Sequence, residues 1–231
     1  MAKSGAGELA IISEMIDKSF YLAGHYVWII NMPHIARLNP VNKILLLAIH
    51  RNFISFCAVL DLTRRGLYGP ARMILRHIYE GLVIAKFCAL SSDRKVFERW
   101  EQGEYIPLTN EILNKIKTPD PDPFRKLWKV LCAFTHATVF SHQEILDARK
   151  NLDEIVITFQ ITRALLECNY HLLVRHFATP SMQYFEKAYG DGHEVPDLKI
   201  KLRKLFAHSH MHMFPPFNKF VITYRRSWIL K

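Results

Sequence analysis

The sequence predicts an all-α protein, and two observations lead to this fold class. Apolar residues recur at the three- and four-residue spacings of a helix face, most clearly at Ala71, Leu75, Ile78 and Leu82. Proline and glycine divide the chain into long segments, and the first 180 residues contain no strand pattern or internal repeat. We therefore expect a bundle of four to five long helices with short accessory helices and an irregular C-terminal arm.

Proline and glycine also set the boundaries of the expected helices. A first helix should span residues 7–31. A second should begin after Pro40 and continue to Arg64, because Gly66 tolerates the backbone that closes a helix C-terminus. A third opens with Pro70 in its first turn.

The later part of the chain is expected to alternate helices with connectors. Residues 118–123 form an extended connector, because their alternating prolines are excluded from the interior of a helix or strand. A long helix should reach Phe177 and stop before Pro180. The other helices expected here span residues 108–116, 124–136 and 197–207.

Two regions follow from these boundaries. Residues 1–180 should form one helical bundle domain, and residues 181–231 a basic, aromatic C-terminal segment that packs on the same domain. The last part of this segment, residues 217–231, is compatible with a strand, a helix or an arm that orders against a partner.

Composition favours a polyanionic partner. The 231 residues include 31 Lys and Arg against 21 Asp and Glu, which gives a formal net charge of +10. The four cysteines form no CxxC pair and lie in apolar segments, as reduced thiols of a cytoplasmic protein do. Polar residues interrupt the longest apolar run, so we expect no membrane span.

The third helix carries a charged pair in apolar surroundings. Arg76 and Glu80 stand four residues apart on the face opposite the apolar stripe, together with Val83 and Phe87. A helix that is apolar on both sides is usually central in its bundle, so these two charges need each other or a third group. The pair therefore has either a structural role, fixing helix register, or a functional one.

Three short motifs of the chain resemble the HEPN superfamily (higher eukaryotes and prokaryotes nucleotide-binding). They are the stretch ARMILRHIYE at residues 71–80, the triplet Phe134-Thr135-His136 and Ser141, and the similarity covers roughly residues 42–176. The resemblance implies a bundle of long helices that is often a homodimer. In many members it cleaves RNA without a metal, and in others it serves as a binding or scaffold module.

In the HEPN nucleases an arginine is followed four to six positions later by a catalytic histidine. Arg203 is followed by polar Lys204, as that motif prefers. His210 stands seven positions after Arg203, one more than the motif's spacing, and falls on the same helical face. In such a site the histidine acts as general acid or base and the arginine stabilises the charge on phosphorus. Family packing would also bring His136 into one cleft with Arg76 and Glu80, so the predicted catalytic residues are Arg203, His210, Arg76, Glu80 and His136.

Cations and aromatic rings alternate near the C-terminus, in a pattern that suits RNA. Cations neutralise phosphates, and rings stack on unpaired bases. The same pattern also fits rings that pack on the bundle while the cations stay in water. The residues that we expect to bind RNA are Lys199, Lys204, Arg225, Arg226 and Trp228.

The remaining motifs give little support to other chemistry. His208, His210 and His212 are spaced as metal ligands can be, but no acidic or cysteine ligand stands at a recognisable spacing from them. We therefore expect no metal or cofactor. Signatures of serine hydrolases, phosphate loops and dinucleotide-binding folds are absent from the sequence. The sequence thus predicts a HEPN-like protein that binds RNA, with metal-independent cleavage in bacterial defence or a toxin system as its further activity. The alternative is a non-enzymatic helical dimerisation or scaffold module.

Overall fold

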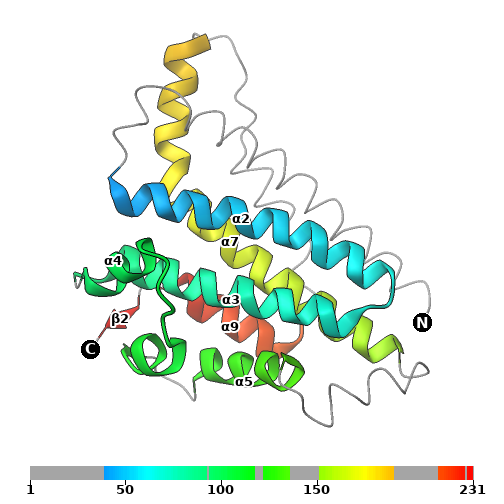
Figure 1. The fold of residues 1–231 in the computed structure, drawn as a ribbon. Coiled ribbons are helices and arrows are strands. Elements are labelled where there is room, and N and C mark those ends of the chain that lie inside the picture. The colour runs from blue at the N-terminus through cyan, green and yellow to red at the C-terminus, as the bar shows by residue number, and fades with distance from the viewer. Residues whose placement is uncertain are drawn as a thin grey trace.

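The computed structural model describes residues 39–92, 94–117, 122–135, 151–189, 213–226 and 228–230. Within these ranges the chain is almost entirely helical, which confirms the all-α class (Figure 1). The first helix expected at residues 7–31 and the helix expected at 197–207 lie outside the described residues. The elements are α2 (Pro40–Arg64), α3 (Tyr68–Leu90), α4 (Lys95–Glu101), η2 (Leu108–Leu113), β1 (Ile116–Lys117), α5 (Pro123–Thr135), α7 (Asn151–Tyr189), α9 (Pro215–Arg225) and β2 (Ile229–Leu230).

Helices α2 and α3 form a hairpin whose ends follow from local chemistry. The side chain of Asn39 accepts a hydrogen bond from the backbone N–H of Asn42 at 3.0 Å, and Pro40 occupies the first helical turn. At the other end Gly66 has φ +75°, and the N–H of Leu67 donates to the carbonyl of Leu62 at 2.9 Å. The bounds of α2 thus confirm the helix expected from Pro40 to Arg64.

Helix α3 is the central element of the described fold. It packs against α2, α5, α7 and η2, and Figure 1 shows it between α2 and α5. Leu75 and Ile78 are fully buried, and so is Val83 on the opposite side of the helix. The expectation that this helix is apolar on both sides and central is therefore confirmed.

A buried arginine joins α3 to α7. Arg72 has no exposed side-chain surface and forms an ion pair with the carboxylate of Glu154. Its Nε donates to Thr158 Oγ1 at 3.1 Å, and its Nη2 donates to the backbone carbonyl of Glu154 at 3.2 Å. Because a buried guanidinium is costly unless its donors are satisfied, these contacts fix how the two helices meet.

Two asparagines make the corresponding link between α2 and α7. Asn52 Nδ2 donates to Asn169 Oδ1 at 3.1 Å, and Asn169 Nδ2 donates to the carbonyl of Ile49 at 3.3 Å. Both asparagines are buried, so this pair satisfies polar groups that water does not reach.

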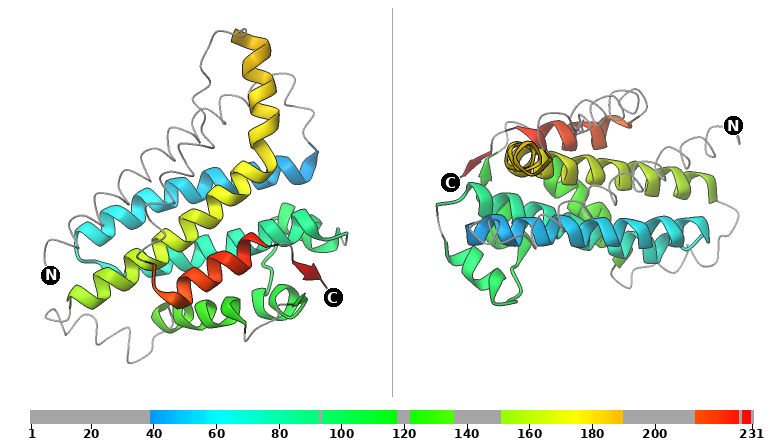
Figure 2. Two further views of the ribbon diagram at one scale, coloured as in Figure 1. Left: turned by 180° about the vertical axis from the view of Figure 1, so that it is seen from behind. Right: turned by 90° about the horizontal axis from the view of Figure 1, so that it is seen from above.

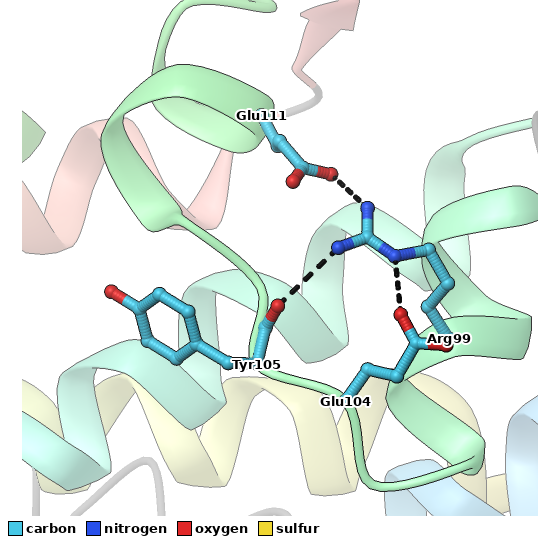
Figure 3. A network of polar contacts seen from close by, with 4 residues as sticks. All are labelled: Arg99, Glu104, Tyr105 and Glu111. Atoms are coloured by element: carbon cyan, nitrogen blue, oxygen red, sulfur yellow. Dashed lines mark hydrogen bonds and ion pairs between the residues drawn. The ribbon is translucent and has the colours of Figure 1, made fainter.

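A single arginine organises the connection from α4 to η2. The guanidinium of Arg99 lies between the carboxylates of Glu104 and Glu111, at 2.8 Å and 2.6 Å, and donates to the carbonyl of Tyr105 at 3.3 Å (Figure 3). The continuous helix expected at residues 108–116 is wrong: η2 is one turn of π-helix, and the chain then enters β1. Strand β1 pairs with β2 in an antiparallel register, so the chain end is tied to its middle.

Helix α7 is longer than the sequence predicted. We expected it to stop before Pro180, and this is wrong because the helix continues to Tyr189. A proline inside a helix removes one hydrogen bond and clashes with the preceding turn, which kinks a helix without always ending it. Figure 2 shows the last part of α7 turning away from the helices that its first part packs against.

The expectation of an irregular C-terminal arm is also wrong for residues 215–225, which form α9. Phe220, Val221 and Tyr224 fall on one face of this helix and are buried against α5 and α7. Burial of that face supplies the free energy that orders the segment.

Helix α2 is long and apolar enough to cross a membrane by length and composition. Its residues Leu45, Ile49 and Phe56 are buried against α3 and α7, as in the core helix of many proteins that never enter a bilayer. The length and composition of α2 are therefore only weak evidence that it spans a membrane.

The Arg72 contacts predict a large loss of stability on substitution. Arg72→Met should lower the free energy of unfolding by about 3 kcal/mol, because it leaves Glu154 without its partner. Arg65→Met is the control, since Arg65 pairs with Asp61 on the surface with 68% of its side chain exposed, and it should cost less than about 0.5 kcal/mol. Urea unfolding followed by circular dichroism measures both. Equal losses in the two variants would contradict the structural role of Arg72.

Candidate nucleic-acid interface

The Arg76–Glu80 pair predicted from helical spacing is formed. Arg76 Nε lies 3.3 Å from Glu80 Oε1, and the two side chains are 23% and 22% exposed. The Arg76 guanidinium also lies over the ring of Trp128 on α5, 4.7 Å from its centroid. Both charges are therefore engaged within the fold, while part of each still reaches water.

A histidine and a second arginine extend this pair towards α2. His77 Nδ1 lies 3.9 Å from Glu80 Oε2, and the guanidinium of Arg51 donates a hydrogen bond to His77 Nε2. Burial, and then the charge of Arg51, lowers the pKa of His77, whereas burial raises the pKa of Glu80 against the opposing effect of Arg76. Neutral His77 would act as a base only if Arg51 released its Nε2. Through these contacts and the Arg76–Trp128 contact, the arrangement connects α2, α3 and α5.

The other predicted catalytic residues lie outside the described residues. These are Arg203, His210 and His136, and the same holds for the predicted RNA-binding residues Lys199 and Lys204. Their approach to Arg76 and Glu80 therefore stays a prediction.

The structure describes the other three predicted RNA-binding residues, Arg225, Arg226 and Trp228. Arg225 and Arg226 are exposed at the C-terminal end of α9. Trp228 is only 8% exposed, and its ring packs edge-on against Phe124 and Tyr224, with centroids 5.2 Å and 5.6 Å away. A base would reach the Trp228 ring only if the C-terminal segment moved. The two arginines are therefore the part of this set available to phosphates.

A buried lysine holds the C-terminal end of α9. Lys86, on α3, is 2% exposed, and its Nζ donates to the backbone carbonyls of Tyr224 and Arg226, the second at 3.0 Å. Nζ also lies 4.5 Å from the centroid of the Tyr224 ring and 4.6 Å from that of Trp228. Because carbonyls at a helix C-terminus lack partners within the helix, the lysine satisfies the end of α9.

The surroundings of Lys86 are electrically positive. Burial, the largest cause, lowers the pKa of Lys86 to about 7; Cys168 opposes this decrease and the charge of Arg175 adds to it. On α7, burial lowers the pKa of His171 to about 4, with further decreases from Lys86, Arg225, Arg175 and His176. All four of these neighbours are cationic or become so on protonation, so they oppose the protonation of His171.

Two ring nitrogens beside this lysine are buried without a hydrogen-bond partner among the described residues. They are His171 Nε2 and Trp228 Nε1. Both rings contact Tyr224, His171 at 6.4 Å and Trp228 at 5.6 Å between centroids. An indole N–H is a donor only, so the partner that it lacks is an acceptor.

Helices α5 and α9 together form a second basic feature. They lie side by side, joined by contacts of Phe124 with Phe220 and Tyr224. Residues 123–135 and 215–226 contain three cations each and no Asp or Glu, and all six cations are exposed. We call these residues the α5–α9 basic surface: Arg125, Lys126, Lys129, Lys219, Arg225 and Arg226.

Sequence reasoning missed both Lys86 and the α5 part of this surface. Lys86 stands alone in the apolar run from Leu82 to Cys88, and a single cation in such a run is itself a signal of a buried, partnered charge. The complete lack of acidic residues in 123–135 was the available signal for α5.

Comparisons with protein-family models, curated proteins and solved structures found no match for this chain. The resemblance to the HEPN superfamily accordingly rests on its short motifs. In the described part of the chain, no group of three His, Cys, Asp or Glu side chains is placed to hold a metal ion, and residues 208–212 lie outside that part.

The geometry of the Arg76–Glu80 pair predicts a moderate cost on substitution. Glu80→Ala should lower the free energy of unfolding by about 2 kcal/mol, less than the 3–5 kcal/mol typical of a fully buried pair, because water still reaches both groups. Asp61→Ala removes the carboxylate of an exposed pair with the same spacing, 58% exposed, and should cost less than about 0.5 kcal/mol. Chemical denaturation measures the difference. A negligible effect of Glu80→Ala would rule out a structural role for the pair.

Proposed function

We propose that this chain is an RNA-binding helical protein of the HEPN-like type. The observation that carries the proposal is the α5–α9 basic surface, in which two neighbouring helices expose six cations and contain no carboxylate. A surface of one charge sign on packed helices attracts a polyanion and holds its own groups at fixed spacing.

The charge pattern around this surface supports phosphate contacts. Arg125 Nε lies 3.1 Å from Asp122 Oδ2, so this cation is partly neutralised, and Asp122 precedes α5 rather than lying within it. Lys126 and Lys129 on α5, and Lys219 on α9, are exposed side chains on long flexible stems. Such lysines follow a phosphate backbone without reading its sequence.

An exposed ring next to α9 suits unpaired bases. Phe214, directly before α9, is 44% exposed, and Ile222 on the outer face of α9 is exposed to the same extent. Because single-stranded nucleic acids bind by stacking as well as by charge, Phe214 takes the role that the buried Trp228 ring does not have. This combination favours single-stranded RNA over a duplex.

The proposal includes metal-independent cleavage as a further activity. In this extension His210 or His136 acts as general acid or base towards the 2′-hydroxyl and the leaving oxygen, and Arg203 stabilises the developing charge. Arg76 and Glu80 would then be positioning residues, since each already holds the other in place. The setting we propose is a cytoplasmic homodimer, each subunit a bundle of four to five long helices, in bacterial defence or a toxin system.

RNA binding is tested by charge reversal on the α5–α9 basic surface. Replacing Lys126, Lys129 and Lys219 together by glutamate should weaken the binding of a single-stranded oligonucleotide at least about tenfold at 0.1 M salt. The dependence of log affinity on log salt concentration should also become shallower by about 2, since about 0.7 ions are released per phosphate contact. Fluorescence anisotropy in a salt series measures both quantities.

A variant with the same change in charge is the control. Lys43, Arg64 and Lys95 are exposed on α2 and α4, and their replacement by glutamate should leave most of the affinity. Equal weakening by the two triple variants would mean that the net charge, and not this surface, attracts RNA. Absence of wild-type binding at low salt would end the proposal.

Cleavage is tested separately. His210→Ala or His136→Ala should abolish the cleavage of single-stranded RNA in the presence of EDTA, while the melting temperature stays nearly unchanged. Gel analysis of end-labelled RNA measures the loss. A wild-type chain that binds diverse RNAs and cuts none of them would remove the enzymatic part and leave the binding part.

One observation favours the non-enzymatic alternative, a dimerisation or scaffold module. Leu47 and Ile54, seven residues apart on α2, are 62% and 51% exposed and lie on one outer side of the helix, with exposed Arg51 between them. In this alternative the Arg76–Glu80 pair is purely structural. A chain that is dimeric by light scattering and has no affinity for RNA at low salt would select it.

A further inference from the structure

Helix α9 is anchored to the core at both of its ends. At its start, the backbone N–H of Phe214 donates to Gln160 Oε1 on α7 at 3.0 Å. At its other end, Lys86 Nζ on α3 donates to the carbonyls of Tyr224 and Arg226, the second at 3.0 Å. Backbone groups at helix termini have no partner within the helix, so Gln160 and Lys86 supply partners that α9 itself lacks. Both of these side chains are buried.

The end of α9 at Lys86 is held by contacts in both directions. The ammonium group of Lys86 lies 4.5 Å from the centroid of the Tyr224 ring and 4.6 Å from that of Trp228, in addition to its two carbonyl acceptors. In return, the hydroxyl of Tyr224 donates to the carbonyl of Leu82 on α3 at 3.0 Å. A shift of this turn would therefore break several contacts at once.

The outer side of α9 carries groups that suit one strand of RNA. Lys219, Ile222 and Arg226 follow one another at spacings of three and four residues, so they lie on one side of the helix, and all three are exposed. Phe214, which is also exposed, stands at the start of the helix. From Phe214 to Arg226 the chain rises about 18 Å, at about 1.5 Å per residue. A stacked strand advances about 3.4 Å per phosphate, so about five nucleotides cover this distance, and fewer do when the strand is extended.

We propose that a single RNA strand lies along the outer side of α9, and that Gln160 and Lys86 are positioning residues that hold its two contact points, Phe214 and Arg226, at a fixed separation. The inference rests on the proposed function, because it assigns a path over the proposed site to that RNA. A base stacks on the Phe214 ring, and phosphates bind Lys219 and Arg226. Contacts that are in place before the RNA arrives lose less entropy on binding.

The two positioning residues act through α9 and not on the RNA itself. Because both are buried, neither side chain is available to a bound strand. Loss of Lys86 frees the end of α9 that carries Arg226, whereas loss of Gln160 frees the start that carries Phe214. Each positioning residue should therefore be coupled to the contact at its own end of the helix.

The length of the RNA tests the path. We use the full chain with a labelled single-stranded octanucleotide, followed by fluorescence anisotropy, and with a dinucleotide as a competitor. Phe214→Ala and Arg226→Gln should each weaken octanucleotide binding at least about fivefold, because the longer strand makes both contacts at once. Each should weaken dinucleotide binding less than about twofold, because a dinucleotide is too short to reach both contacts and can use the other one. Equal effects on the two RNAs would overturn the path.

Double variants test the positioning residues. Lys86→Met should weaken octanucleotide binding at least about fivefold, and it should remove most of the effect of Arg226→Gln when the two are combined. Gln160→Leu should in the same way remove most of the effect of Phe214→Ala. Fully additive effects in both double variants would overturn the positioning role. If one of the two anchor variants fails to fold, the other double variant and the comparison of RNA lengths still decide the question.

Arg72→Met is the matched control for Lys86→Met. It also replaces a buried cation of α3, but Arg72 contacts Glu154 and Thr158 on α7. It should lower the free energy of unfolding while the folded protein keeps its affinity for the octanucleotide. Equal losses of affinity in Arg72→Met and Lys86→Met would show that stability alone is responsible, which overturns the positioning role and leaves the proposed function intact. Absence of RNA binding in the wild type would overturn both.

Discussion

The burial of α3 on several sides is the constraint on which the other features depend. A polar group buried on this helix has little access to water, so it needs a partner within the fold. Arg72 finds Glu154 and Thr158 on α7, Lys86 finds the carbonyl end of α9, and Tyr79 donates its hydroxyl to the carbonyl of Phe124 on α5 at 2.7 Å. The apolar surface of α3 supplies the driving force for packing. Its few polar groups determine which helix lies where.

Helix α9 shows how one short element serves both the core and the surface. Its rings point inward, where Phe220 and Tyr224 are buried, and Lys219, Arg225 and Arg226 remain in water. The sequence was compatible with two roles for the aromatic rings of this segment, packing on the bundle or stacking on RNA bases. Phe220 and Tyr224 pack on the bundle, so the exposed cations of α9 are its groups available to a polyanion. Because α9 is held by α5, α7 and Lys86, those cations stand on a fixed support.

The sequence was sufficient for features that depend on neighbours along the chain. Pro40 and Gly66 mark the ends of α2, and the four-residue spacing of Arg76 and Glu80 predicts their ion pair, because both follow from local backbone geometry. It failed where the partner is distant. Nothing near Lys86 in the sequence points to residues some 140 positions later, and the local rule for proline did not predict that α7 continues through Pro180. The candidate site divides in the same way, since Arg225 and Arg226 were recognisable from local composition and the Lys86 cluster was not.

The contacts of Lys86 have a consequence for how the protein is made. Its two carbonyl partners are 138 and 140 residues further along the chain. A ribosome delivers residues in order, so during translation the completed α3 must wait, with an unsatisfied lysine in its apolar face, until α9 has emerged. A chain interrupted before α9 would therefore leave α3 open to chaperones and proteases.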